Sequence, residues 1–205
     1  MEPAGLPQAL VLLDYFGIAV FAVSGALLAA ERRQTLVTFL FFAVVTGVGG
    51  GTLRDLLIGA PVFWVQTNTY LLVCMGAALL TWLASRRFIA EPALLWFDAA
   101  GLAAYATYGA AKALDYGVAP VPAFAMGVLT ACAGGIIRDV LAGEPSILLR
   151  PELYVTAAAL SSGLFVGLAF LGMSLPIAGG IAAIAGFALR GLAIARGWSL
   201  PAYRD

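Results

Sequence analysis

The sequence predicts an all-α integral membrane protein, in which seven transmembrane helices form two inverted three-helix repeats plus a seventh helix. Three observations predict this fold. Hydrophobic residues make up 62% of the chain and charged residues only 11%, whereas soluble domains carry about 25% charged residues. Apolar windows long enough to cross a membrane recur along the chain. Most of the sequence is also written twice, with an offset of 84 residues.

The apolar windows define the predicted elements. A helix that crosses the hydrocarbon core needs about 20 predominantly apolar residues. The predicted spans are residues 11–30, 36–58, 68–85, 94–113, 120–142, 152–171 and 175–195. The first window has Glu2 rather than a positive region ahead of it, and Arg32 and Arg33 follow it in place of a cleavage site. We therefore expect it to be a retained span and not a signal peptide.

The spans belong to an internal duplication. The segment GGTLRDLLIGAP at 50–61 returns at 134–145 as GGIIRDVLAGEP. The same offset relates further pairs: Asp14 and Asp98, Gly17 and Gly101, Gly25 and Gly109, Thr46 and Thr130, and Tyr70 and Tyr154. We expect one membrane domain, residues 1–205, with repeat 1 at 10–88 and repeat 2 at 94–172. The last span, 175–195, has no counterpart and is expected at the side of the repeats or in an oligomer interface.

The number of spans in each repeat and the positions of the basic residues predict how the chain crosses the membrane. Because three is an odd number, the second repeat enters from the side opposite to the first. This arrangement is typical of transport proteins, whose solute path lies at the repeat interface. The basic residues outside the spans all follow odd-numbered spans: Arg32, Arg33, Arg86, Arg87, Arg150, Arg196 and Arg204. The positive-inside rule therefore places the N-terminus outside and the C-terminus in the cytoplasm.

Glycines interrupt the second span of each repeat. Gly49, Gly50 and Gly51 lie in the first copy, and Gly134 and Gly135 lie in the second. Each glycine costs about 1 kcal/mol relative to alanine within a helix. Successive helical residues point about 100° apart, so one packed neighbour does not account for three glycines in a row. We expect a kink or an unwound turn in each of these spans.

Thr46 and Thr130 lie one turn before these glycines. Their hydroxyls, together with the carbonyls that an unwound turn would free, are oxygen ligands suited to a partly dehydrated cation. The alternative is that the glycines allow helices to pack closely. Close packing is the role that we assign to four glycines on the first span of each repeat: Gly17, Gly25, Gly101 and Gly109.

Each repeat also carries an Arg-Asp pair inside its second span, where ionisable residues are costly and usually functional. The pairs are Arg54 with Asp55 and Arg138 with Asp139. Adjacent residues on a helix do not face each other. We therefore expect the arginine and the aspartate of one pair to have different partners.

Depth in the membrane suggests those partners. Arg54 is expected to meet Asp14, and by symmetry Arg138 is expected to meet Asp98. The second aspartate of each pair would then be free to face the path, where it would attract cations and repel anions. The alternative is that all six charges form structural networks or helix-end caps. The sequence leaves open which member of each pair faces the water.

Lys112 breaks the symmetry of the repeats, because its counterpart is Leu28. Two roles are open for it. It can form an interfacial salt bridge with Asp115, three residues further along the same helix. It can also act as a voltage-responsive charge at the mouth of a pore.

Composition excludes several classes of function. The net charge is zero and no basic run is large enough for a nucleic-acid footprint. The absence of histidine excludes most zinc sites and histidine-based catalysis. Cys74 and Cys132 lie in different spans without CxxC spacing, which predicts packing residues rather than a redox pair. We expect no enzyme activity, no structural metal and no cofactor.

The doubled signature GG-x-x-RD-x-L-x-G-x-P, on the second and fifth of seven spans, resembles the prokaryotic members of the trimeric intracellular cation (TRIC) channel family. This family is also described as a glycine transporter or uncharacterised bacterial membrane family. The resemblance covers residues 10 to 195. It implies a homotrimer in which each protomer has its own pore, lined by kinked second and fifth spans and conducting potassium and sodium.

The resemblance also assigns site residues. The glycine segments of the pore helices fall on Gly49, Gly50 and Gly51 and on Gly134 and Gly135, and the charged pairs fall on the two Arg-Asp pairs. Ala133 stands where the first copy has Gly49, so the second break is expected to be milder. The basic motif that animal members use for lipid contact has at most one candidate, Lys112.

Residues and resemblance together predict a passive channel of the bacterial or archaeal cytoplasmic (inner) membrane, with potassium or sodium as the permeant ion. Its expected partners are membrane lipids and two further copies of the chain, with no nucleic acid and no soluble protein. An inverted repeat would equally serve a secondary transporter of a small zwitterion such as glycine. A membrane enzyme is disfavoured, because the chain offers no nucleophile motif and no soluble domain.

Overall fold

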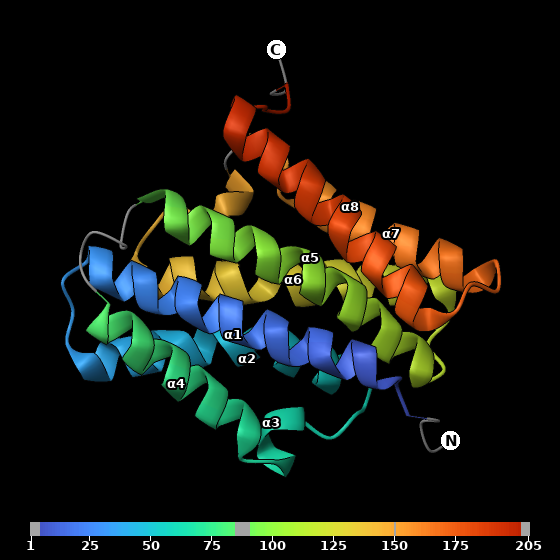
Figure 1. Ribbon diagram of the computed structural model, residues 1–205, viewed down its shortest axis with the longest axis horizontal. Coiled ribbons are helices and arrows are strands. Elements are labelled where there is room, and N and C mark those ends of the chain that lie inside the picture. The colour runs from blue at the N-terminus through green and yellow to red at the C-terminus, as the bar shows by residue number, and fades with distance from the viewer. Residues whose placement is uncertain (1–4, 85–90, 150, 202–205) are drawn as a thin grey trace.

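The computed structural model describes residues 5–84, 91–149 and 151–201. Its long elements are all helices: α1 (Gln8–Glu31), α2 (Leu36–Leu57), α4 (Thr69–Leu83), α5 (Glu91–Asp115), α6 (Pro120–Ala142), α7 (Val155–Phe170) and α8 (Leu175–Arg196). Two short elements, α3 (Phe63–Gln66) and the 3-10 helix η2 (Ile147–Leu149), follow α2 and α6. Each predicted window coincides with one of the long helices (Figure 1).

Length and hydropathy together divide these helices, and α5, with 25 residues, is long but is not among the most apolar. Among the described residues, four helices are long and apolar enough to cross a membrane by themselves: α1, α2, α6 and α8. The helices α4 and α7 have 15 and 16 residues, fewer than the about 20 that a span requires. Four of the arginines on which the predicted orientation rests lie outside the described residues: Arg86, Arg87, Arg150 and Arg204.

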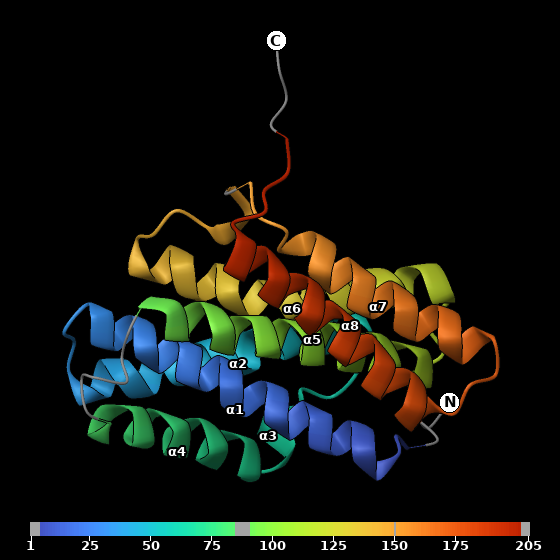
Figure 2. The ribbon, with the colours of Figure 1, turned by 45° about the horizontal axis from the view of Figure 1, so that its top comes forward.

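The order of the elements repeats along the chain. An offset of 84 residues relates each element of the second half to one of the first: α5 corresponds to α1, α6 to α2, η2 to α3 and α7 to α4. The packing repeats as well, because α2 and α4 both pack on α1 and on each other, and α6 and α7 do the same with α5. The two groups meet through α1 against α5 and α2 against α6. Figures 1 and 2 show α4 and α7 on opposite flanks of this centre.

Two glycines and two aromatic rings join α1 to α5. The rings of Phe21 and Tyr105, which are counterparts in the two repeats, lie with centroids 5.4 Å apart. A Cβ on Gly17 would lie 2.9 Å from the ring of Tyr105, and one on Gly101 would lie 2.8 Å from the ring of Phe21. Each ring therefore occupies the space above the glycine of the other helix. The close-packing role expected for these two glycines is confirmed.

The last helix, α8, packs on α7 and α5 at the side of the second repeat. Arg190 of α8 is 2% exposed and bonds Glu152, which precedes α7, at 2.5 Å. The backbone beyond α8 adds an isolated bridge between Glu152 and Ser199 and a bond from the Leu200 amide to the Pro151 carbonyl. These contacts fix the Arg190 side chain and the C-terminal end of α8 to repeat 2.

Candidate functional site

The crossing of α2 and α6 is a contact between two backbones. A Cβ on Gly134 would lie 2.5 Å from the carbonyl oxygen of Thr46, and a Cβ on Gly50 would overlap the carbonyl oxygen of Thr130. These four residues exchange places under the 84-residue offset. Because residues 46 and 50 of α2 meet residues 134 and 130 of α6, the helices run antiparallel where they cross.

The consecutive glycines of α2 each face a different neighbour. A Cβ on Gly49 would lie 3.1 Å from Cδ1 of Ile137, and one on Gly51 would lie 2.6 Å from the ring of Phe63. Gly50, between them, faces the backbone of α6. Three glycines in a row are therefore explained by three separate close contacts.

Of the two expected interruptions, a kink or an unwound turn, the unwound turn is wrong, and the kink stays a prediction. Helix α2 runs without interruption from Leu36 to Leu57, and α6 runs from Pro120 to Ala142. The physical reason is that packing against a neighbouring backbone offsets the helix cost of a glycine, about 1 kcal/mol. Within the helices, the hydroxyl of Thr130 bonds the Met126 carbonyl at 2.6 Å. Among the described residues the buried hydroxyl of Thr46 has no hydrogen-bond partner.

A buried charge cluster lies at the C-terminal end of α2. Asp55 is fully buried and accepts from Nε of Arg54 at 2.8 Å. The ammonium group of Lys112, from α5, lies 2.9 Å from each oxygen of the same carboxylate. The backbone amide of Phe63, in α3, donates a hydrogen bond to the same carboxylate at 3.0 Å. Two cations and one amide therefore hold this carboxylate.

Aromatic rings surround the two cations of this first cluster. The guanidinium of Arg54 lies 5.3 Å from the ring centroid of Tyr108 and 5.8 Å from that of Phe63. The ammonium of Lys112 lies 5.6 Å from the ring of Phe63 and 5.9 Å from that of Tyr116. Cation–π contacts of this kind stabilise cations that have been removed from water.

A second cluster with the same construction lies at the C-terminal end of α6. Arg138 donates from Nε to Asp139 at 2.9 Å, and the amide of Ile147, in η2, donates to the same carboxylate at 3.1 Å. Nη1 of Arg138 also bonds Asp98 at 2.7 Å and the hydroxyl of Ser24 at 3.0 Å. Because α2 and α6 run antiparallel, the two clusters lie on opposite sides of the crossing.

Of the two ion pairs predicted between repeat-related arginines and aspartates, one is present. Arg138 meets Asp98 as expected. Within the described part of the chain, Arg54 makes no ion pair with Asp14, although the two interact electrostatically. One carboxylate oxygen of Asp14 and one guanidinium nitrogen of Arg54 have no hydrogen-bond partner among these residues.

The prediction that the aspartates of the two pairs are free is wrong. Asp55 and Asp139 each bond the arginine that precedes them in sequence. The arginine and the aspartate of one pair leave the helix in different directions, but the arginine side chain is long enough to fold back to the neighbouring aspartate. The chain then turns after each helix and presents an amide to the same carboxylate. Asp55 is 0% exposed and Asp139 is 7% exposed.

Lys112 does not pair with Asp115, and that prediction is also wrong. Its side chain crosses to Asp55 in the other repeat, because a buried ammonium is stabilised more by a buried carboxylate than by a partly exposed one. Leu28, at the equivalent position of α1, offers no such cation to Asp139. Counted over residues 5–84, 91–149 and 151–201, the first cluster therefore has one cation more than the second.

A cavity of about 340 Å³ lies beside Asp139. Its wall is formed by Leu28, Glu31, Leu94, Leu95, Arg138, Asp139, Glu144 and Ile147. Glu144 follows α6 and forms an ion pair with Arg32, which follows α1. This pair joins the two repeats next to the cavity. At the equivalent positions of the first cluster stand Ala60 and Tyr116.

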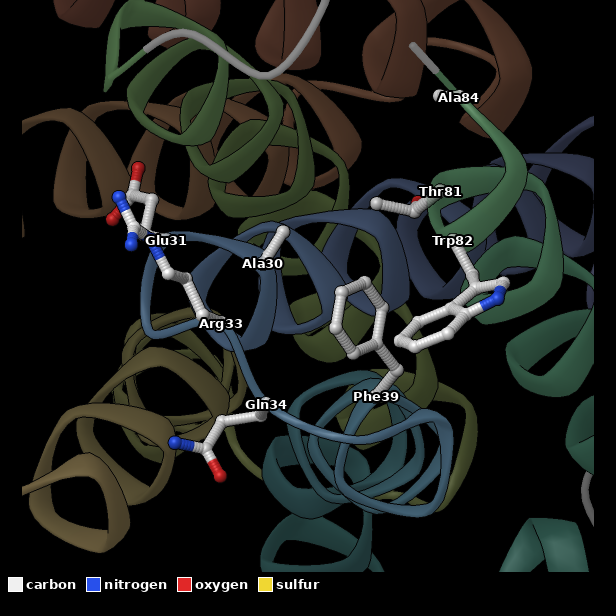
Figure 3. A pocket seen from close by; sticks show the side chains of 8 residues that line it. All are labelled: Ala30, Glu31, Arg33, Gln34, Phe39, Thr81, Trp82 and Ala84. Atoms are coloured by element: carbon white, nitrogen blue, oxygen red, sulfur yellow. The ribbon is translucent and has the colours of Figure 1, made fainter. Parts of the chain in front are cut away.

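A separate cavity of about 550 Å³ lies between the ends of α1, α2 and α4, and contains no member of either charge cluster (Figure 3). Its wall is formed by Ala30, Glu31, Arg33, Gln34, Phe39, Thr81, Trp82 and Ala84. The rings of Phe39 and Trp82 meet edge to face there, with centroids 4.9 Å apart.

Sequence reasoning missed the ion pair between Arg190 and Glu152 and the two amides that cap the cluster aspartates. Arg190 was visible as an arginine inside the predicted span 175–195, which is a signal for a buried partner. The amides of Phe63 and Ile147 gave no signal, because their positions depend on how the chain turns after α2 and α6.

Comparison with known proteins identifies related sequences. A family model described as "Glycine transporter" matches residues 11–86 and again residues 95–170, once in each predicted repeat. A UPF0126 membrane protein of Vibrio cholerae is 46% identical over 162 residues, which cover 76% of this chain and 66% of that protein. The UPF0126 inner membrane protein YadS of Escherichia coli K12 is 43% identical over 168 residues, covering 80% of this chain and 81% of that protein.

Solved structures resemble the chain over nearly its whole length. The TRIC trimeric intracellular cation channel orthologue from Rhodobacter sphaeroides superposes with a TM-score of 0.87 at 42% sequence identity. The match covers 94% of this chain and 100% of that one. These matches are to channels and membrane proteins, not to enzymes.

Proposed function

The chain belongs to the prokaryotic TRIC channel family, whose family model is described as "Glycine transporter", and on that premise we propose that it is a passive channel for potassium and sodium. Its likeness to TRIC structures supports a cation channel. The observation that carries the proposal is this likeness, a TM-score of 0.87 at 42% identity to a TRIC cation channel orthologue. The second buried charge cluster supports it, because Asp139 lines a cavity at the end of α6, where a carboxylate favours cations over anions, whereas Asp55 is neutralised by Arg54 and Lys112.

The proposed path follows α2 and α6 within each protomer. The residues assigned to it are Thr46, Gly49, Gly50, Gly51, Asp55, Thr130, Gly134, Gly135 and Asp139. The charge network that supports it comprises Asp14, Arg54, Asp98, Lys112 and Arg138. Because the two helices touch through their backbones at the crossing, conduction requires them to separate there.

The membrane arrangement is part of the same proposal. Seven spans cross the cytoplasmic membrane as two inverted repeats and α8, with the N-terminus outside and the C-terminus inside. The antiparallel crossing of equivalent helices supports the inverted arrangement. The proposal includes assembly as a homotrimer, which is supported by the likeness to the Rhodobacter sphaeroides protein, named as a trimeric intracellular cation channel orthologue. Exposed apolar side chains such as Leu12, Leu72 and Phe170 are available to lipid or to neighbouring copies.

The test is the reversal potential of the purified protein in planar bilayers under a KCl gradient. We expect unitary currents that reverse near the potassium equilibrium potential. Asp139→Asn should move the reversal toward zero more than Asp55→Asn does, because Asp55 is already neutralised by two cations. Asp115→Asn, which removes an equal charge outside both clusters, is the control.

The second candidate function is secondary transport of a small zwitterion such as glycine, which the description of the family model favours. Liposomes that contain the protein would then show saturable, gradient-coupled glycine uptake, and bilayers would show no unitary current. That combination would overturn the channel proposal. Unitary cation current without glycine uptake would overturn the transporter.

A further inference from the structure

The two charge clusters are copies of one construction that differ at a single cation. In the first, Lys112 contacts the carboxylate of Asp55 and packs over the ring of Phe63, beside Arg54. The counterparts of these four residues in the second cluster are Leu28, Asp139, Ile147 and Arg138. All four counterparts line the cavity of about 340 Å³. The cavity therefore lies where the lysine lies in the first cluster.

The buried charges are balanced in one cluster and unbalanced in the other. The first cluster contains two carboxylates, Asp14 and Asp55, and two cations, Arg54 and Lys112. Among the described residues, the second contains two buried carboxylates, Asp98 and Asp139, and Arg138 as their cation. Glu31 and Glu144 also line its cavity, and Glu144 pairs with Arg32. An uncompensated buried charge is costly in a medium of low dielectric constant. Within the described part of the chain, the second cluster therefore has one cation fewer than the first, next to a cavity with space for it.

We propose that this cavity binds one small monovalent cation of ammonium or potassium size, which takes the place that the Lys112 ammonium occupies in the first cluster. The carboxylate of Asp139 supplies the oxygen ligands, and the walls of the cavity leave space for retained water. One positive charge restores the balance found in the first cluster, so a monovalent ion fits better than a divalent one. The inference rests on the proposed function in that the site lies on the proposed cation path.

The probe is methylammonium, which carries the terminal group of a lysine side chain. A ligand that binds only the folded protein raises its thermal stability with concentration. The melting temperature of the whole protein in detergent is measured during a methylammonium chloride titration, with N-methyl-D-glucamine chloride holding the ionic strength constant. We expect a saturating rise, and an equivalent rise with KCl.

Two variants, together with one control variant, test the position of the site. Asp139→Asn removes the ligand, and we expect the midpoint of the methylammonium titration to shift upward by about tenfold or more. Leu28→Lys installs the missing lysine, and we expect it to abolish the titration because the ammonium is then part of the chain. Leu28→Met fills a similar volume without charge and should retain a titration. Loss of the response in Leu28→Met as complete as in Leu28→Lys would overturn the proposal.

The outcomes separate this inference from the proposed function. The site is overturned, and the channel is retained, if the wild-type protein conducts potassium in bilayers but methylammonium does not stabilise it. The same conclusion follows if methylammonium stabilises the wild type and Asp139→Asn equally. Wild-type protein that shows the Asp139-dependent response but passes no current retains the site and overturns the channel. If Leu28→Lys does not fold, the Asp139→Asn comparison decides.

Discussion

The backbone contact between α2 and α6 predicts that one methyl group at position 134 destabilises the protein. The added Cβ would lie 2.5 Å from the carbonyl oxygen of Thr46, about 0.9 Å nearer than the 3.4 Å at which ordinary contact begins. The obstacle belongs to the backbone of a continuous helix, so no side-chain rotation relieves it. The two helices must separate at their crossing. Overpacking of this kind costs about 1–3 kcal/mol.

The control for Gly134→Ala is the same substitution at Gly76, in the middle of α4, where no atom lies within 4 Å of the added Cβ. There the better helix propensity of alanine should stabilise the protein by about 0.5–1 kcal/mol. The two variants carry the same chemical change, so the propensity gain is common to both, and their unfolding free energies should differ by the overpacking cost of about 1–3 kcal/mol.

The assay is equilibrium unfolding in mixed detergent micelles, followed by the helical circular dichroism signal. Gly50→Ala, the reciprocal change, should lower stability as well, because its Cβ meets the carbonyl oxygen of Thr130. A Gly134→Ala protein as stable as the Gly76→Ala protein would refute the reasoning. It would mean that α2 and α6 are not in backbone contact in the folded protein.

Two further predictions concern buried cations. Lys112→Met should lower the unfolding free energy by about 3 kcal/mol, because it removes one partner of a buried ion pair. Methylammonium should restore part of this loss in a thermal melt of the variant. Equal melting temperatures with and without the amine would contradict this prediction. Arg190→Met should loosen α8, because it removes the bond to Glu152 and the contact over the ring of Tyr154. Faster amide hydrogen exchange in α8, with α4 unchanged, is the expected result, and uniform exchange across both helices would count against it.

Composition and periodicity predicted the helices well because apolar length is a strong local signal. Each predicted span falls on a long helix, and the 84-residue offset reappears in the order and packing of the elements. The ion pair between Asp98 and Arg138 followed from the depth of the two residues in successive helices. Such features depend on one helix or on one pair of neighbouring helices.

The features that were not predicted depend on tertiary positions. Lys112 of α5 reaches a carboxylate of α2 that lies 57 residues away along the chain, and only the contact between α5 and α2 in the folded protein shows which carboxylate is near. The glycines of α2 were interpreted as a break because sequence does not reveal that three different neighbours approach them. A helix break and a close contact require the same residue type for different reasons.

In the proposed channel with inverted repeats, the one-cation difference between the described parts of the two clusters would bear on the direction of ion flow. A protein built from two equivalent inverted halves looks the same from either side of a membrane, and such a protein conducts equally in both directions. Rectification therefore has to originate at positions where the halves differ, such as Lys112 opposite Leu28, or Glu144 opposite Ala60. An assembly of identical three-helix chains would carry every substitution at both mouths. Joining the halves in one polypeptide allows inward and outward conductance to be adjusted separately.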